Sequence, residues 1–317
     1  MNIIVIGGSA GALPAVKQIF SAVTSPLDGA VFIVIHFPED KISYLPKILG
    51  KKSVMPALHA SDGCVIEKGK IYIAPPARHM IIKEGKTFLS DGPKENRFRP
   101  SIDVLFRSAA TAYGPMVTGI ILSGALDDGV AGLIAIKKSG GATIVQDPTD
   151  AIMDGLPLNA LKNVKEDYCL PAAKISAVLK IICDNKPKEV AMKKNKLYEW
   201  ENAMADGHVM DMEAIKKHTE PTRYICPLCE GPLFKLRDFS FNRYRCFVGH
   251  AFSGQTLLND VDEKVEHLPW TAYRTLDEKK EMLKNMVTSN SELKKQEEKI
   301  NHDLQFLDEL LQNNTVQ

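Results

Sequence analysis

The chain has 317 residues, of which 44% are hydrophobic, so it can bury one sizeable core and still carry a smaller module. Its formal net charge is +1, so bulk electrostatics gives no reason to expect a nucleic-acid or membrane partner. No apolar stretch approaches the roughly 20 residues of a membrane-spanning helix, and the strand-like start leaves no room for a cleavable signal.

The six cysteines are unevenly placed. Cys226, Cys229 and Cys246 lie close together, whereas positions 64, 169 and 183 are scattered. This spacing is not that of a disulfide framework. We therefore expect a reducing compartment, the cytoplasm.

Residues 1–184 alternate apolar runs with helix-like segments, which is typical of an α/β domain with a mostly parallel sheet flanked by helices. The pattern predicts strands at 3–6, 31–35, 117–122 and 142–146, and helices at 12–22, 101–112, 129–138, 156–163 and 172–183. Shorter segments, such as 70–74 and 80–83, are interrupted by Pro75-Pro76 and Glu84-Gly85-Lys86. They predict a small antiparallel hairpin added to the sheet.

The rest of the chain divides into three further segments. Residues 185–221 are rich in lysine, methionine and glutamate and predict a linker with one short helix near 211–217. Residues 222–253 hold the cysteine cluster, and residues 254–317 predict a helical tail. Between Pro269 and about Leu311 the tail has neither glycine nor internal proline, which favours one long helix.

Apolar residues of this tail repeat every seven positions in two sets that lie three residues apart, as a and d positions of a coiled coil do. The sets are Leu283, Leu304 and Leu311, and Met286, Leu293, Ile300 and Leu307. Asn290 and Glu297 interrupt the first set and weaken the seam. The pattern predicts an amphipathic helix and leaves a homodimer through the tail open.

Ser9 follows the first apolar run in a Gly-x-Ser-x-Gly turn, where a nucleophile can stand clear of its own backbone. Such a turn can instead bind phosphate, but Ser9 and Ala12 replace two glycines of the dinucleotide-binding fingerprint. His36 also stands where that fingerprint requires an acid. A second alternative, that Ser9 only caps the following helix, stays open.

His36 and Asp128 also follow predicted strands, so a parallel sheet would bring them to the same edge as Ser9. Taken singly, a histidine at the end of a buried strand is more often a satisfied core residue. Asp128 alone would be an ordinary helix-capping acid, and Asp127 competes with it for any role. The three residues together favour a serine hydrolase, although their order differs from that of the α/β-hydrolases.

In this interpretation, His36 takes the proton of the Ser9 hydroxyl, and Asp128 orients the imidazole and stabilises its charged form. Backbone N–H groups at the start of the following helix, including that of Ala10, would bind the developing oxyanion. We expect no cofactor for this catalysis.

Five stretches occur in order along residues 1–184: Ile6–Gly11, Ile35-His36, Ile73–Pro75, Arg97–Phe106, and Leu122–Gly124 with Asp128-Gly129. In them the chain resembles the catalytic domain of the chemotaxis protein-glutamate methylesterases, the CheB family. The resemblance implies a parallel-sheet α/β fold with an added hairpin, and Ser9, His36 and Asp128 as the triad. It also implies hydrolysis of methyl esters on glutamate side chains of receptor signalling helices, with glutamine deamidation in many members.

The resemblance also makes Arg97 and Arg99 candidate contacts for an acidic receptor helix, with a solvated basic loop as the alternative. Ala10, Ala12 and Ala125 depart from residues frequent in the family, which can alter substrate fit. The well-known members also carry an amino-terminal receiver domain, which this sequence lacks. We therefore expect this control to be absent or supplied by another protein, and the substrate to be a methylated receptor or another signalling protein.

Cys226, Cys229, Cys246 and His250 have the number and spacing of ligands for a structural zinc ion. Four protein ligands leave the metal no open position, so the predicted zinc would stabilise a ribbon-like module rather than catalyse. Free cysteines with a chance histidine are the alternative.

The sequence as a whole predicts a protein-glutamate methylesterase with a zinc-ribbon-like module and a helical tail. A related amidase or deamidase would use the same acyl-transfer groups. The rival from another class is a catalytically idle scaffold that binds partners through the module and the tail.

Overall fold

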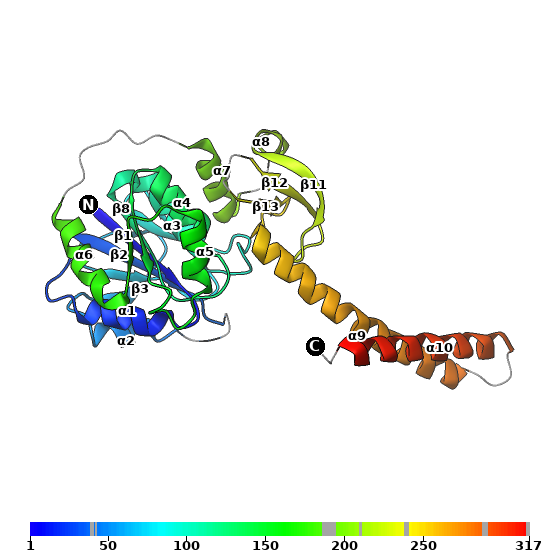
Figure 1. Ribbon diagram of the computed structural model, residues 1–317. Helices are drawn as coiled ribbons and strands as arrows, with labels where there is room; N and C mark the ends of the chain where they lie inside the picture. The colour runs from blue at the N-terminus through cyan, green and yellow to red at the C-terminus, as the bar shows by residue number, and fades with distance from the viewer. Residues whose placement is uncertain are drawn as a thin grey trace. The chain divides into compact units, whose positions relative to one another are not determined.

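The computed structural model of the chain describes residues 1–38, 41, 43–185, 195–208, 211–237, 241–286 and 291–314. The chain divides into two compact units, Met1–Thr256 and Leu257–Gln317, which are described separately below. Figure 1 shows the sheets of the first unit and the long helices of the carboxyl-terminal part.

The largest sheet of the first unit is entirely parallel, with the strand order β10-β9-β8-β1-β2-β5-β3. Its strands are β1 (Asn2–Gly8), β2 (Gly29–Ile35), β3 (Ala57–His59), β5 (Ile71–Ile73), β8 (Val117–Ile121), β9 (Ala142–Gln146) and β10 (Tyr168–Leu170). The strand order reverses direction at β1. In open parallel sheets, the carboxyl ends of the strands beside such a reversal form the usual binding crevice.

Helices cover both faces of this sheet (Figure 1). Successive side chains of β1 point to opposite faces, and each face contributes to its own core. One face packs against α1 (Ala12–Ser21), α2 (Leu45–Gly50) and α6 (Ala172–Asp184), and the other against α3 (Ile102–Tyr113), α4 (Val130–Lys138) and α5 (Gly155–Asn163). A short 3-10 helix, η1 (Gly114–Met116), leads into β8. The predicted fold class is confirmed, and the predicted strands and helices end within two residues of the observed ones.

The antiparallel hairpin is present, but its composition differs from the prediction. Segment 70–74 contains β5, which pairs in parallel with β2 and β3 in the main sheet. The hairpin is formed by β6 (His79–Lys83) and β7 (Lys86–Ser90), and β4 (Cys64–Val65) joins β7 in a separate sheet. Its turn, Glu84-Gly85, has positive φ at both residues, which matches the twist of a tight hairpin.

The segment 185–221 contains more helix than its sequence pattern predicts. Besides α8 (Met212–His218), close to the helix expected near 211–217, the structure has α7 (Lys196–Ala205), which packs against α3. The side chain of Asn195 caps α7 by accepting a hydrogen bond from the Leu197 N–H at 3.0 Å. One of the buried positions of α7 is a glutamate, Glu201, so an apolar pattern does not reveal this helix.

The cysteine-containing segment forms a four-stranded antiparallel sheet in chain order. Its strands are β11 (Thr219–Ile225), β12 (Pro232–Leu236), β13 (Arg243–Cys246) and β14 (Ala251–Ser253). Cys226 and Cys229 lie in the turn from β11 to β12, Cys246 ends β13, and His250 lies in the turn from β13 to β14. This sheet belongs to the same compact unit as the parallel sheet.

The carboxyl-terminal part has two described helices, α9 (Gly254–Met286) and α10 (Ser291–Asn314), where the pattern predicts one continuous helix from 269 to 311. The expectation of a single helix is therefore wrong, and Pro269 lies inside α9. The amphipathic character is confirmed: residues of both predicted heptad sets share one cluster, formed by Leu283, Ile300 and Leu304 with Tyr273, Leu276 and Leu293. Position 290 lies outside the described residues. No described helix is both long enough and apolar enough to span a membrane.

Candidate active site

Ser9, His36 and the loop after β8 meet at the carboxyl edge of the parallel sheet. Gly8 pairs with Ile35 at the ends of β1 and β2, and the His36 N–H donates to the Gly8 carbonyl at 3.1 Å. The Ser9 N–H donates to the carbonyl of Ser123 at 2.9 Å, just beyond β8. Backbone hydrogen bonds thus fix the positions from which the candidate side chains project.

Ser9 does not occupy the capping position of α1. The N-cap residue is Gly11, with φ of 80°, and no side chain caps this helix. Glycine suits this left-handed conformation, and its missing side chain avoids a clash, because a Cβ there would lie 2.5 Å from the Ser123 hydroxyl oxygen. The capping alternative for Ser9 is therefore not observed.

His36 and Asp128 form a buried hydrogen-bonded pair, called the dyad below. His36 Nε2 lies 2.9 Å from Asp128 Oδ2. The imidazole stacks on the Phe98 ring, with centroids 3.6 Å apart and planes 9° from parallel. The other ring nitrogen, Nδ1, is buried and has no hydrogen-bond partner among the described residues. A neutral imidazole that donates to Asp128 through Nε2 has its basic lone pair on Nδ1.

The Asp128 carboxylate lies at the amino terminus of α3, where backbone N–H groups and the helix dipole favour an anion. It accepts hydrogen bonds from the Ser101 hydroxyl at 2.8 Å, the Ile102 N–H at 2.7 Å and the Asn96 amide at 3.0 Å. Burial alone would raise the pKa of Asp128, but His36, the Asn96 amide and the Ile102 N–H hold it below its usual value. Asp128 is therefore ionised at neutral pH.

The two adjacent acids, Asp127 and Asp128, face different partners. Asp127 Oδ1 accepts a hydrogen bond from the Thr256 hydroxyl at 2.8 Å, while Asp128 faces His36. Burial raises the pKa of Asp127. A third acid, Asp103, accepts the N–H groups of Gly129 and Gly132 at 3.0 and 2.6 Å and so fixes the loop that carries Asp128.

The other candidate residues at this edge, Ala10, Arg97 and Arg99, differ in their exposure and hydrogen bonds. Ala10 is exposed, and its carbonyl accepts a hydrogen bond from the Ser123 hydroxyl at 2.8 Å. Arg99 donates from one guanidinium nitrogen to the carbonyls of Asp91 at 2.6 Å and Gly92 at 3.0 Å. Arg97 is half-buried with a positive φ of 74°. Ser9 and His36, both described, are not hydrogen-bonded to each other.

No motif in the sequence identifies Asn96, Phe98 or Ser101 as neighbours of the dyad. They lie within or beside the stretch Arg97–Phe106, yet spacing along a loop does not tell which side chains turn toward His36. Only the arrangement of this loop between strand ends and the start of α3 makes them neighbours.

The structure brings Cys226, Cys229, Cys246 and His250 together, with their candidate ligand atoms within 4.8 Å of one another. The sulfurs of Cys229 and Cys246 are 3.5 Å apart, and His250 Nδ1 lies 3.7 and 3.5 Å from those of Cys226 and Cys246. In a tetrahedron with Zn–S bonds near 2.3 Å, neighbouring sulfurs are about 3.8 Å apart. These separations are close to those of a tetrahedral site, so the four residues could hold a metal ion.

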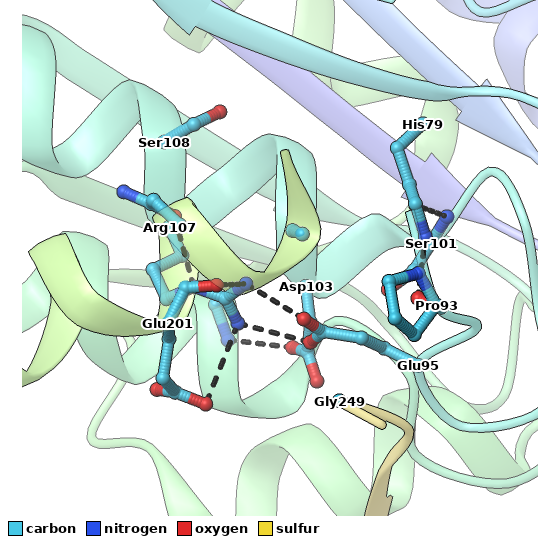
Figure 2. A network of polar contacts seen from close by, with 12 residues as sticks. His79, Pro93, Glu95, Ser101, Asp103, Arg107, Ser108, Glu201 and Gly249 are labelled. Carbon is cyan, nitrogen blue, oxygen red and sulfur yellow. Dashed lines mark hydrogen bonds and ion pairs between the residues drawn. The ribbon is translucent and has the colours of Figure 1, made fainter. Parts of the chain in front are cut away.

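A buried ion cluster joins the parallel-sheet domain, α7 and the cysteine-containing sheet (Figure 2). Arg107 donates to both carboxylate oxygens of Glu95, at 3.0 and 2.8 Å. Arg245 donates to Glu95 at 2.8 Å and to Glu201 at 3.0 Å, and Arg243 donates to Glu201 at 2.9 Å. Burial alone would raise the pKa of both glutamates, but the three guanidinium groups hold both below their usual values.

Comparison with known proteins gives consistent matches over the first part of the chain. A protein-family profile described as CheB methylesterase matches residues 4–179. A Methanosarcina mazei protein named protein-glutamate methylesterase/protein-glutamine glutaminase 2 is 35% identical over 190 residues, which cover 57% of this chain and 52% of that protein. A Leptospira interrogans relative named for the same two activities is 38% identical over 174 residues, 55% of this chain and 90% of the relative.

A solved structure resembles the same region. The crystal structure of the Thermotoga maritima CheB methylesterase catalytic domain superposes with a TM-score of 0.55 and 30% sequence identity. The match covers 57% of this chain and 98% of the Thermotoga domain. The chain thus contains the equivalent of nearly that whole domain, while it spans about half the length of the Methanosarcina relative.

Proposed function

Because the chain belongs to the CheB methylesterase family, we propose that it hydrolyses methyl esters of glutamate side chains in proteins. The observation that carries the proposal is the dyad at the sheet edge from which Ser9 begins the turn into α1. His36 Nδ1 is buried there and has no hydrogen-bond partner in the described part of the chain. The names of the Methanosarcina and Leptospira relatives support this substrate chemistry.

In the proposed reaction, Ser9 Oγ attacks the ester carbonyl carbon while His36 Nδ1 accepts the hydroxyl proton. Asp128 stabilises the resulting imidazolium through the 2.9 Å hydrogen bond to Nε2. The Ala10 N–H is proposed to bind the oxyanion. The tetrahedral intermediate then expels methanol, which takes the proton from His36. Water hydrolyses the acyl-Ser9 ester by the same steps, restores the serine and releases the glutamate carboxylate.

The proposed substrates are methylated helices of chemoreceptors or other signalling proteins, met in the cytoplasm. Arg97 and Arg99 are the proposed contacts for acidic residues of such a helix. The Nη1 group of Arg99 is anchored by two backbone carbonyls and its Nε is buried, so Nη2 would serve this role.

A second proposed activity is deamidation of protein glutamine, which the printed names of the relatives favour. The same steps apply, with ammonia as the leaving group in place of methanol. Catalysis requires no cofactor in this mechanism. Cys226, Cys229, Cys246 and His250 are proposed to hold a structural zinc ion.

The test is methanol release from methylated receptor membranes by the unmodified chain, Ser9→Ala and Ser21→Ala. Ser21 is an exposed serine on α1 and serves as the matched control. We expect Ser9→Ala to reduce release by roughly 10³-fold or more, because the nucleophile is lost, and Ser21→Ala to behave as the unmodified chain. Equal release by the Ser9→Ala variant and the unmodified chain would show that Ser9 is not the nucleophile.

A further inference from the structure

The loop 94–98 lies between the dyad and the cysteine-containing sheet. On one side it contacts both members of the dyad: the Asn96 amide donates to Asp128 Oδ1 at 3.0 Å, and the Phe98 ring stacks on His36. The geometry of the dyad therefore depends on where this loop is held.

On its other side, the loop is hydrogen-bonded to β14. The Ala251 N–H donates to the Lys94 carbonyl at 3.2 Å, and the Asn96 N–H donates to the Ala251 carbonyl at 2.8 Å. The Ser253 N–H donates to the Asn96 side-chain oxygen at 2.9 Å. Asn96 is thus bonded through both its backbone and its side chain, which stabilises its left-handed backbone conformation, with φ of 49°.

A second link reaches the residue next to Asp128. The Thr256 hydroxyl donates to Asp127 at 2.8 Å, and the side chain of Ser253 also hydrogen-bonds Asp127. Ser253 and Thr256 are both buried, so these bonds are shielded from water. The segment from β14 into α9 therefore contacts Asp127 directly and Asp128 through Asn96.

β14 pairs with β13 and adjoins two of the candidate metal ligands. His250 directly precedes β14, its carbonyl accepts the Cys246 N–H at 2.9 Å, and Cys246 ends the neighbouring strand β13. Arg245 of β13 donates to the carbonyl of Gly249 in this turn at 2.7 Å and to Glu95 of the loop at 2.8 Å. A metal held by Cys246 and His250 would fix this turn in addition to these hydrogen bonds.

We propose that Asn96 is a positioning residue for the dyad, and that the metal-bound module aligns the active site by holding Asn96 through β14. This inference rests on the proposed function and adds to it a dependence of the esterase on the metal module. If the ligands lose their metal, β14 is released, Asn96 loses its partners, and Asp128 and His36 lose the loop that supports them. A displacement of about 1 Å in a catalytic group can reduce the rate by about 100-fold.

The first test uses variants that keep all four ligands. Asn96→Gly removes the amide and tolerates the positive φ, Thr256→Val removes the hydroxyl bond to Asp127, and the exposed Asn163→Ala is the control. The readouts are zinc content, the downfield proton resonance of the His36–Asp128 hydrogen bond with isotope-labelled histidine, and the rate at which a fluorophosphonate labels Ser9. We expect Asn96→Gly to keep its zinc, to shift or broaden the resonance, and to slow labelling about tenfold to 100-fold. Thr256→Val should produce a smaller change in the same direction.

The second test removes the metal from the full chain, by chelation and by Cys229→Ser, with Cys169→Ser as a cysteine control outside the cluster. In both metal-free proteins we expect the His36 resonance to change as it does in Asn96→Gly. Added Zn²⁺ should restore the original resonance in the chelated chain but not in Cys229→Ser, which lacks one ligand. If chelation unfolds the whole chain, the proposal is decided by the first test, whose variants retain their zinc.

The proposal is overturned if Asn96→Gly leaves the His36 resonance unchanged and Ser9 labelling within twofold of the unmodified chain. It is also overturned if a zinc-free chain, in which the cysteine-containing sheet has lost its structure, keeps the His36 resonance and the rate of Ser9 labelling of the unmodified chain. Failure of the proposed function would look different: the unmodified, zinc-loaded chain would release no methanol. The resonance of the dyad would still report whether Asn96 and the metal position it.

Discussion

At the scale of single residues, the surroundings of Asp127 and Asp128 assign them different roles, although the two acids are adjacent in sequence. Asp128 accepts donors from the start of α3 and faces His36, whereas Asp127 faces Thr256. The sequence leaves both acids as candidates, because nothing in two consecutive aspartates indicates which carboxylate turns toward the histidine. The position of Ser9 and His36 at strand ends was predictable, since parallel strands bring their carboxyl ends to one edge.

Asp128→Asn tests this assignment. We expect esterase activity to fall by about 10⁴-fold, because an amide stabilises neither the required tautomer nor the imidazolium. Asp127→Asn should lose much less, since its side-chain oxygen can still accept the Thr256 hydroxyl. The measurement is kcat/KM for methanol release, with zinc content as the check on folding. Equal losses in the two variants would contradict the distinct roles.

At the scale of elements, predictability from the sequence followed apolar periodicity. β1 and α1 were predicted nearly to their ends because their buried positions, apart from Asn2, carry no polar side chain. α7 was not, because its buried Glu201 is neutralised by arginines from other elements. The tail shows a second limit: its heptad pattern predicts the apolar stripe but not whether that stripe meets a second chain or folds back onto α9.

Leu304→Ala tests whether the apolar stripe packs within the chain. Leu304 is buried with Leu283 and Ile300, so its truncation should cost about 2–4 kcal/mol of packing free energy between α9 and α10. The matched control is Leu258→Ala, because Leu258 is an exposed leucine of α9. Hydrogen exchange measured by mass spectrometry should show faster exchange over 291–314 in Leu304→Ala only. Unchanged exchange in that variant would mean that the α9–α10 packing contributes little.

At the scale of the whole molecule, the buried ion cluster connects three parts of the chain that are far apart in sequence. Glu95 precedes α3, Glu201 belongs to α7, and Arg243 and Arg245 belong to β13. Breaking a buried pair leaves an uncompensated charge, so each part is held by the charges of the others. With any bound metal retained, the cysteine-containing sheet and the parallel-sheet domain are therefore expected to unfold together in urea rather than as independent domains.

The pKa values of Glu95 and Glu201 give this cluster a pH dependence of definite sign. Both are below the ordinary value in the folded chain, so the unfolded chain binds more protons as the pH falls below about 4.3. The stability contributed by these carboxylates is fully present above that pH and is lost as the pH falls through the folded pKa values. Acid should therefore weaken the connection between the three parts by protonating the Glu95 and Glu201 carboxylates.

Comparison of Glu201→Gln with Glu199→Gln isolates this effect, because Glu199 is exposed on the same helix. At pH 7, Glu201→Gln should be less stable by about 3–5 kcal/mol, since it removes one partner of a buried ion cluster. The difference should shrink as the pH falls below about 4, because Glu201 of the control becomes protonated in the unfolded chain there and, at lower pH, in the folded chain as well. Urea unfolding at a series of pH values measures the difference in the free energy of unfolding between the two variants. Any release of a bound metal by acid affects both variants alike. A difference that stays constant down to pH 3 would show that the charge of Glu201 does not stabilise the fold.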